Sequence, residues 1–515
     1  MRKTIIRTIF ISIIIFIIIF FIIYLFTMRI NMLSIGNTME SIDRINWYLS
    51  NDGDYYLFLS KNIDRNHLYI KIDTNYDGAI YKCYDINGNK IGNIKNNSYT
   101  DIFNYDELVI SVSLKNRITS RYKVHVIQSD IPSLFIKIKG GDSNYNRILS
   151  SKYHTIGYKA DALLYDDDNN MDSLKIKKIR GRGNSTWLRP KRPYQIKLYD
   201  NYSLLGMKEA NKWVLLTNHW DGSLSRNYLW YTLSKELDIT YSVDCYPVDL
   251  YINNNYLGSY LISNRVEVSP SSVDIDNNYL FEINNTMTYD LELKHGYRLK
   301  IKNVDLKRID EEYGLIIKEE ILKHLNKIED LIYDTNVSLD ELSDYIDIDS
   351  FIKYYWVQEI SLNYDASRGS NYLYMKDDKL YMGPIWDMDN TMNRSYIYAK
   401  TDENYILENK LLNSRVNENW YKELYKKDGF STLIDNYYIE NKDIFNNLPL
   451  LLSDYHKKIR NSANMNYIRW DYNNMKDEQI RVWVSKDNGF LSSMNLFEKS
   501  LNERINYYNQ VYSID

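Results

Sequence analysis

The sequence predicts an α+β protein in which an apolar N-terminal helix, a small all-β module and a large mixed domain follow one another along 515 residues. Three observations support this prediction. Residues 9–26 form an apolar run, residues 42–129 contain short segments of alternating polar and apolar residues, and from residue 130 strand-like segments give way to helical periodicity. Strands that precede helices, instead of alternating with them, are typical of the α+β class.

The composition excludes several classes of protein. The 64 Lys and Arg residues nearly balance the 68 Asp and Glu residues, so the formal net charge of −4 gives no reason to expect a nucleic-acid partner. Two cysteines, Cys83 and Cys245, are too few for a disulfide framework or a CxxC metal site, although a single bridge between them stays open. The seven histidines show no HExxH or clustered spacing, which argues against a zinc enzyme.

The N-terminus has the pattern of an uncleaved signal anchor. Arg2, Lys3 and Arg7 precede the apolar run of residues 9–26. As a helix with a rise of about 1.5 Å per residue, this run would be about 27 Å long and could just cross the hydrocarbon core of a bilayer. No A-x-A-like cleavage site follows it. The positive charges before the helix predict a single-pass membrane protein whose N-terminus is inside and whose remaining chain is outside.

The next part of the chain has the pattern of a small β-module. Segments such as residues 55–60 and 122–128 alternate apolar and polar residues, and Asp-Gly and Asn-Gly turns separate several of them. This spacing predicts an antiparallel sandwich of immunoglobulin-like type over residues 42–129. A linker over residues 29–41 would join it to the anchor and its cytoplasmic stub in residues 1–28. The module carries no catalytic constellation, so we expect a spacer or adhesive role.

The large domain begins with strand-like segments and continues with helices. Apolar residues recur at helical spacing from Ile317 to Ile332. Ser338 and Glu341 form a capping-box pattern that predicts the start of another helix. A further helix is expected to be capped near Asp349, and most of the remaining chain shows amphipathic helical patterns.

A glycine turn followed by a strand lysine is the first candidate site. Gly181 and Gly183 lie two positions apart between two strand-like segments, where backbone N–H groups could approach phosphate oxygens. Lys197 lies on the second strand, on the face opposite its apolar residues. Protein kinases hold the phosphates of ATP with a glycine-rich turn and a strand lysine in this order. The alternative is an ordinary hairpin with a solvent-facing lysine.

The second candidate site is the run "GPIWDMDNTM" at residues 383–392. Asp387 and Asp389 lie two positions apart, and divalent cations require carboxylate oxygens grouped in this way. Asp365 and Asn371 precede them. Kinases use, in this order, an Asp that accepts the proton of the substrate hydroxyl, an Asn on the metal, and an Asp that holds Mg²⁺. We therefore predict this set as catalytic and metal-binding; the alternative is a polar loop facing water.

Several stretches resemble the spore coat protein H (CotH) kinase family of atypical secreted protein kinases. Together they span about residues 131–510, and the R-G-x-G-N-S-T-W and P-x-W-D-x-D patterns are far more specific than a lone G-x-G. The matching stretches are "IRGRGNSTWLRPKRPYQIKL", "GMKEANKWVLLTNHWDGSLSRNYL", "VDLYINNNYLGSYLI", the run from "DIDSF" to "WDMDNTM", and the final helix with Arg504.

The resemblance implies a two-lobed kinase-like domain over residues 130–512, with an N-lobe at about 131–265 and a C-lobe at 266–512. It also implies ATP- and Mg²⁺- or Mn²⁺-dependent phosphorylation of serines, possible targets being spore coat or cell-envelope proteins. The residues with implied roles are Lys197 on the phosphates, Asp365 as the catalytic aspartate, Asp387 and Asn371 on the metal, Asp389 as an additional metal group, and Gly181, Arg182, Gly183 and Arg226 at the phosphates.

One departure from the family keeps two other functions open. Where the family often has Thr-Glu, this chain has Ser263 and Asn264, so Glu267 or Glu282 would have to substitute. Loss of that glutamate favours a catalytically inactive kinase-like adhesin, or a structural envelope or spore protein. The coat proteins of the family also generally lack a membrane anchor, so a coat role does not transfer automatically.

Overall fold

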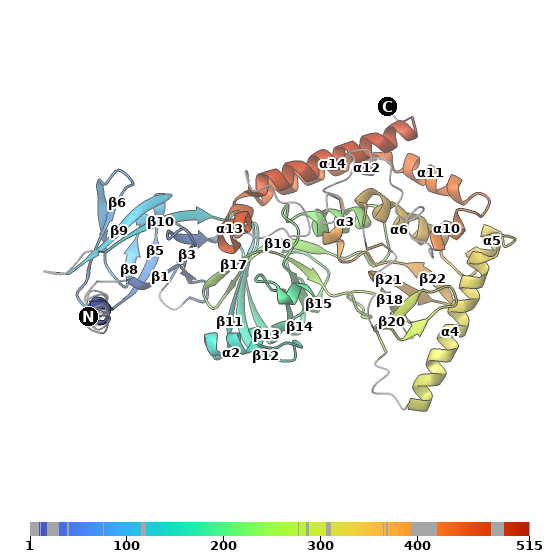
Figure 1. Cartoon of the computed structure of the whole chain (residues 1–515), viewed down its shortest axis with the longest axis horizontal. Coiled ribbons are helices and arrows are strands. Elements are labelled where there is room, and N and C mark those ends of the chain that lie inside the picture. The colour runs from blue at the N-terminus through green and yellow to red at the C-terminus, as the bar shows by residue number, and fades with distance from the viewer. Residues whose placement is uncertain are drawn as a thin grey trace, which may run out of the picture. The chain divides into compact units, whose positions relative to one another are not determined.

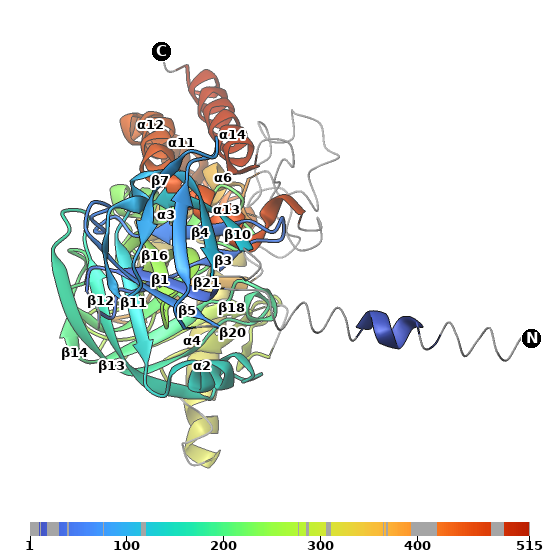
Figure 2. The same ribbon diagram turned by 90° about the vertical axis from the view of Figure 1, so that its left-hand side faces the viewer.

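The computed structural model describes most of the chain, which divides into two compact units. One unit comprises Met1–Asp142, Asp161–Leu174 and Asp249–Gly258, and the other comprises the remaining segments. Figures 1 and 2 show β-sheets together with helices, most of which follow strand β20 (Arg298–Ile301) in the chain, which confirms the predicted α+β class. The described residues are 10, 12–17, 30–38, 41–75, 77–114, 120–276, 278–284, 288–304, 311–363, 365–366, 369–392, 420–474 and 489–513.

The prediction of a membrane anchor is wrong on the evidence of the helices in the structure. Within the described residues, none of the helices is both long enough and apolar enough to cross a bilayer. Of the apolar run at residues 9–26, residue 10 and residues 12–17 are described and are helical; the rest lies outside the described residues. The single-pass topology is therefore not retained.

Two β-sheets follow near the N-terminus, and every strand pair in them is antiparallel except β4 with β10. The strands predicted from alternation are confirmed, whereas the immunoglobulin-like topology stays a prediction. Strand β1 lies inside the segment expected to be a linker, residues 29–41. The sheet orders are β2 (Ile45–Asn46), β1 (Ile30–Gly36), β5 (Leu68–Thr74) and β8 (Ser98–Thr100), and β3 (Tyr48–Leu49), β4 (Tyr55–Leu59), β10 (Ser120–Gln128), β9 (Glu107–Ser113), β6 (Ile80–Tyr84) and β7 (Lys90–Ile94).

A closed barrel forms the next part of the chain. Its interior is apolar, since Ile179, Ile196 and Trp213 lie in register on neighbouring strands and are fully buried. Helix α2 (Gly141–Leu149) and the short η2 (Thr186–Leu188) are insertions between barrel strands. The strand order is β11 (Ser133–Ile138), β12 (Gly157–Tyr165), β13 (Met171–Gly181), β14 (Tyr194–Tyr202), β15 (Ala210–Leu216), β17 (Asn255–Asn264) and β16 (Cys245–Ile252).

A second sheet and most of the helices share one apolar core in the larger unit. Helix α4 runs along this sheet, and α12 lies beside α14 in both views (Figures 1 and 2). The sheet order is β19 (Leu291–Glu292), β20 (Arg298–Ile301), β18 (Leu280–Asn284), β21 (Gly369–Lys376) and β22 (Lys379–Met382). The helices are α3 (Arg226–Glu236), α4 (Glu311–Tyr333), α5 (Leu339–Ser343), α6 (Ile348–Ser361), η3 (Met388–Asn390), α10 (Trp420–Leu424), α11 (Phe430–Glu440), α12 (Lys442–Lys458), α13 (Arg460–Trp470) and α14 (Gly489–Val511).

Local sequence signals account for several of these helices. The apolar stripe of α4 is buried against the core, as its periodicity predicts. The capping box at α5 is confirmed, because the Glu341 N–H donates to Ser338 Oγ at 3.2 Å and the Ser338 N–H donates to Glu341 Oε2 at 3.0 Å. Helix α6 is capped by Asp347, whose Oδ1 accepts the Ser350 N–H at 2.8 Å, and not by the expected Asp349. Both cysteines are free thiols.

We predict that Gly181→Ala destabilises the larger unit. A Cβ at this position would lie 2.3 Å from the Trp187 indole, so the buried ring would have to move. Overpacking of this kind costs about 1–3 kcal/mol, which thermal or urea unfolding would measure. The matched control is Gly369→Ala, where no heavy atom lies within 4 Å of the added Cβ. Equal stability of the two variants would contradict the packing argument.

Candidate functional site

Asp365 lies in a turn directly after helix α6, and Asn371 on strand β21 holds that turn. The Asn371 Nδ2 donates to the backbone oxygens of Asp365 at 2.7 Å and Gly369 at 2.6 Å. Its Oδ1 accepts the hydroxyl of the buried Tyr354. Both ends of this buried amide are therefore engaged, and Asn371 positions the Asp365 turn. Its predicted role on a metal stays a prediction.

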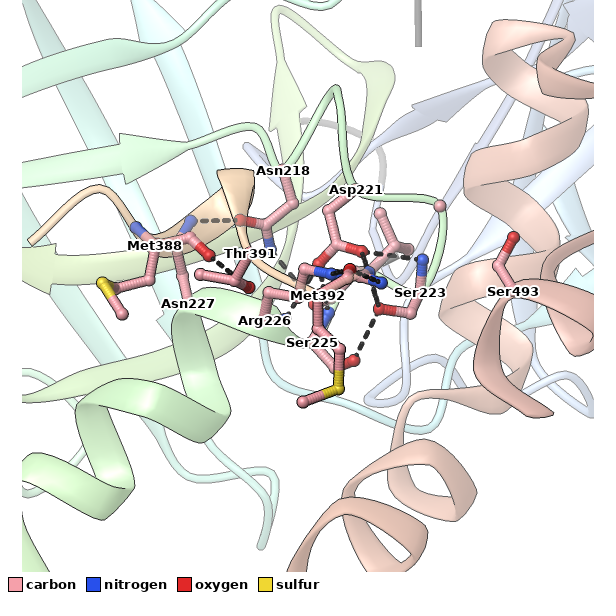
Figure 3. Close-up of polar contacts among 12 residues, drawn as sticks. Asn218, Asp221, Ser223, Ser225, Arg226, Asn227, Met388, Thr391, Met392 and Ser493 are labelled. Atoms are coloured by element: carbon pink, nitrogen blue, oxygen red, sulfur yellow. Dashed lines mark hydrogen bonds and ion pairs between the residues drawn. The ribbon is translucent and has the colours of Figure 1, made fainter. Parts of the chain in front are cut away.

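The segment of residues 383–392 is anchored on helix α3. Asp387 has a left-handed backbone with φ 60°, which aspartate tolerates better than most residues. Its N–H donates to the Tyr231 hydroxyl at 3.2 Å, and the next N–H, of Met388, donates to Asn227 Oδ1 at 2.8 Å (Figure 3). Two side chains on α3 therefore fix the backbone at Asp387.

Asn390 connects the two segments and is a residue that the sequence interpretation missed. Its Nδ2 donates to Asp365 Oδ2 at 2.5 Å. The side chain is 4% exposed, and its Oδ1 is buried without a hydrogen-bond partner among the described residues. A buried acceptor without a donor costs free energy unless a ligand satisfies it, and amide oxygens are ligands for hard cations. The signal was present in the sequence, since Asn390 directly follows "WDMD".

The charges around Asp387 are unevenly distributed. Desolvation by the surrounding protein raises the pKa of Asp387, although the residue itself is exposed to solvent. A hydrogen bond from Ser370 and the charge of Arg182 lower that pKa, whereas the charges of Asp365 and Glu282 raise it. Carboxylates that repel each other in this way favour a bound cation.

The protein side chains alone do not complete a metal centre. Within the described ranges, no three His, Cys, Asp or Glu side chains are grouped so that they could hold a metal ion. Two carboxylates and one amide oxygen would leave positions for water and phosphate oxygens. Mg²⁺ is usually bound in this way, by one or two carboxylates together with substrate phosphates.

Arg182 brings a positive charge next to Asp387. The Arg182 guanidinium is 5.6 Å from the centroid of the Trp386 ring, next to Asp387. Burial lowers the pKa of Arg182, and the charge of Asp387 opposes this effect. Lys197 is half-buried on the predicted face of β14, in register with Lys212 on β15.

The glycine turn has a structural role that the sequence did not show. Gly181 is covered by the Trp187 ring, and Gly183 adopts φ +82°, in the left-handed region that favours glycine. Between them, the Arg182 N–H donates to the Pro193 backbone oxygen at 3.2 Å. That N–H is therefore not directed at a ligand, and the turn contributes the Arg182 side chain instead.

Arg226 does not occupy the phosphate-binding position that was predicted for it. It is buried and forms an ion pair with Asp221 (Figure 3). Its Nε and Nη2 donate to the Met392 backbone oxygen at 3.3 and 3.1 Å, and its Nη1 donates to Ser223 Oγ at 2.9 Å. Two of its nitrogens thus hold the end of the 383–392 segment, and the third holds the Asp221 loop. The charge of Asp389 also acts on Arg226, which places Asp389 toward this network.

The site thus combines acidic and amide oxygens with the guanidinium group of Arg182. Proteins that bind phosphate groups together with a divalent cation combine the same kinds of group. The chain belongs to the CotH kinase protein family, because the family model matches residues 179–510, well over half of the 515 residues. The predicted family is thereby confirmed. A comparison with curated proteins finds no match.

We predict that Asp387→Asn stabilises the protein at pH 7. Because the pKa of Asp387 is raised in the folded state, ionisation at neutral pH costs more in the folded than in the unfolded chain. The stability gained by the variant should shrink as the pH falls through the raised pKa of Asp387 toward about 3.9, the ordinary pKa of aspartate. Thermal unfolding from pH 4 to 8 measures it.

The control for this experiment is Asp85→Asn. Hydrogen bonds, first of all from the Asn89 side chain, lower the pKa of Asp85. The ionised Asp85 carboxylate therefore stabilises the folded state when the pH is above the ordinary pKa of aspartate. Substitution there should not raise the melting temperature at pH 7. A melting temperature of Asp387→Asn below that of the wild type at pH 7 would contradict a raised pKa of Asp387 in the folded state.

We also predict that Asp221→Ala strongly destabilises the protein. It would leave the Arg226 guanidinium buried without its counter-charge, which costs about 3–5 kcal/mol. The control is Asp330→Ala, which removes the exposed partner of Lys294 and should cost about 0–1 kcal/mol. Urea unfolding compares the two. Similar losses of unfolding free energy in the two variants would contradict a special role for the buried ion pair.

Proposed function

We propose that this protein is an ATP-dependent kinase that phosphorylates serine residues of other proteins with Mg²⁺ or Mn²⁺. Family membership supports a kinase-like protein. The observation that carries the proposal is the Asn390 amide, which bonds Asp365 and leaves a buried Oδ1 without a partner beside Asp387. Coat or envelope proteins are proposed as substrates because the family is linked to the spore coat.

In this proposal the fold is divided as in kinases. The barrel strands up to Asn264 belong to an N-lobe at about residues 131–265, and the second sheet and helices belong to a C-lobe at 266–512. ATP would bind between the Arg182 side and the Asp387 side of the site. The β-module of residues 42–129 is proposed as an immunoglobulin-like spacer.

Asp365 is proposed as the catalytic aspartate. Its Oδ2 accepts the Asn390 amide, which fixes the orientation of the carboxylate. The carboxylate would accept the proton of the substrate serine as the serine oxygen forms a bond to the γ-phosphorus and ADP departs. Asn371 supports this geometry by holding the backbone oxygen of Asp365.

The metal site is proposed from acidic and amide oxygens of the 383–392 segment. Asp387, Asp389 and the Asn390 Oδ1 would hold Mg²⁺ or Mn²⁺, which would offset the charge of the phosphates. The orphaned Oδ1 and the raised pKa of Asp387 both favour a cation at this position. Arg182 would contact the phosphates from the opposite side, and Lys197 is proposed to assist it.

A catalytically inactive adhesin or scaffold is the second candidate. It is favoured by Asn264, which stands where the family often has glutamate; its Nδ2 donates to the Ser271 backbone oxygen at 3.2 Å. The ion pair of Glu267 with Lys212 argues against it, since it provides a glutamate–lysine pair close by.

We predict that the full-length protein transfers label from γ-³²P-ATP to a serine-rich protein in the presence of Mg²⁺ or Mn²⁺. Asp387→Ala and Asp365→Ala should lower the rate at least about 100-fold, because each removes a group that acts at the reacting phosphate. Asp330→Ala, a substitution of an exposed carboxylate, is the control. Equal labelling by wild type and both variants would remove the site assignment.

The same assay distinguishes the proposed role of Asn390 from that of Asn371. Asn390→Ala should raise the metal concentration needed for half-maximal rate by about 10–100-fold, as expected for loss of a metal-site residue. Asn371→Ala should mainly lower the melting temperature, because it removes bonds to the backbone of the Asp365 turn. If Asn371→Ala changed the metal requirement and Asn390→Ala did not, the assignment would be reversed.

A further inference from the structure

Cationic side chains are concentrated on one face of the barrel in the larger unit. Four residues on neighbouring strands lie opposite one another in register. They are Arg180 on β13, Gln195 on β14, Val214 on β15 and Ser263 on β17. Arg265 follows Ser263 by two residues. Paired residues of a sheet project to the same face. The cations at this face are Lys178, Arg180, Lys197, Lys212 and Arg265.

Glu267 fixes two of these cations. Its carboxylate accepts the Lys212 Nζ at 2.9 Å on each oxygen, and the Arg265 Nη1 lies 3.5 Å from Oε2. One negative charge therefore faces two positive charges. The Arg265 side chain keeps 40% of its surface exposed, so part of its guanidinium fork can reach a ligand.

Arg265 is also close to the other arginines of the site. Burial lowers the pKa of Arg180 and of Arg182, and in both cases the charge of Arg265 lowers it further. Arg180 is held by the neutral oxygens of Gln195 and His154, at 3.2 and 3.1 Å. Arg265 therefore lies close enough to Arg180 and Arg182 for its charge to act on both, while Asp387 is the carboxylate that acts on Arg182. A bound polyanion would remove this repulsion.

We propose that Arg265, oriented by Glu267, binds the β- and γ-phosphates of a nucleoside triphosphate. Arg265 acts with Arg182, and the Glu267–Lys212 pair takes the place of the glutamate that is missing at Asn264. A guanidinium fork matches two phosphate oxygens at once, which a lysine does not. This assignment rests on the proposed kinase function for the identity of the nucleotide.

The test measures binding by the full-length protein with Mn²⁺ at constant concentration. Calorimetry compares ATP, AMP and inorganic tripolyphosphate as ligands. Arg265→Gln should weaken ATP and tripolyphosphate at least 10-fold and AMP less than 2-fold, because AMP lacks the outer phosphates. The matched control is Arg298→Gln, which removes an arginine of the same 40% exposure whose partner is Glu292; it should change each affinity less than 2-fold.

Two further variants keep the test decisive if Arg265→Gln does not fold. Arg265→Lys keeps the charge and loses the fork, so ATP affinity should fall 3- to 10-fold. Glu267→Gln releases Arg265 and Lys212 and should have an effect in the same range. Unchanged ATP affinity in all folded variants would overturn the assignment of Arg265.

The outcomes separate this inference from the proposed function. If wild type binds ATP and Arg265→Gln binds it equally well, the kinase proposal stands and the role of Arg265 falls. If wild type binds tripolyphosphate but not ATP, and Arg265→Gln loses that binding, the kinase proposal falls and Arg265 stands as a polyphosphate ligand. If wild type binds none of the three ligands, both are overturned.

Discussion

The site depends on a buried ion pair between Arg226 and Asp221. Asp221 also accepts the backbone N–H groups of Ser223, Ser225 and Arg226, so its loop and the start of helix α3 form one rigid unit. Arg226 in turn holds the Met392 oxygen at the end of the 383–392 segment. Because a buried charge without its partner strongly destabilises the folded state, any arrangement that separated Arg226 from Asp221 would be costly in free energy.

On that support the site brings together charges of both signs. The charges of Asp365, Glu282 and Arg182 act on Asp387, and those of Asp387 and Arg265 act on Arg182. Without a ligand, the repulsion among the carboxylates and among the guanidinium groups costs free energy, since like charges repel more strongly where water is displaced. A divalent cation and a polyphosphate would offset both costs together, which is the physical reason for the proposed chemistry.

Much of the fold could be predicted because its signals are local. Alternation gave the strands, helical spacing gave α4, and Ser338 with Glu341 gave a cap. The roles of individual polar residues could not be predicted in the same way. Arg226 and Asn371 appeared suited to ligands, but burial directs Arg226 to Met392 and Asn371 to the Asp365 turn. The membrane anchor was predicted from an apolar run, the positive charges before it and the lack of a cleavage site, but no described helix meets its requirements.

By itself, the sequence determined the α+β class, the family and the two segments that carry Asp365 and Asp387, because short motifs and periodicity are properties of the local chain. The tertiary structure decided which side chains meet. Asn390 and Asp365 are 25 residues apart, yet their side chains are hydrogen-bonded. Lys212 reaches Glu267 across 55 residues. Such contacts depend on how strands and helices pack, and the hydrogen-bond partners available after packing decide whether a polar residue supports the backbone or faces a ligand.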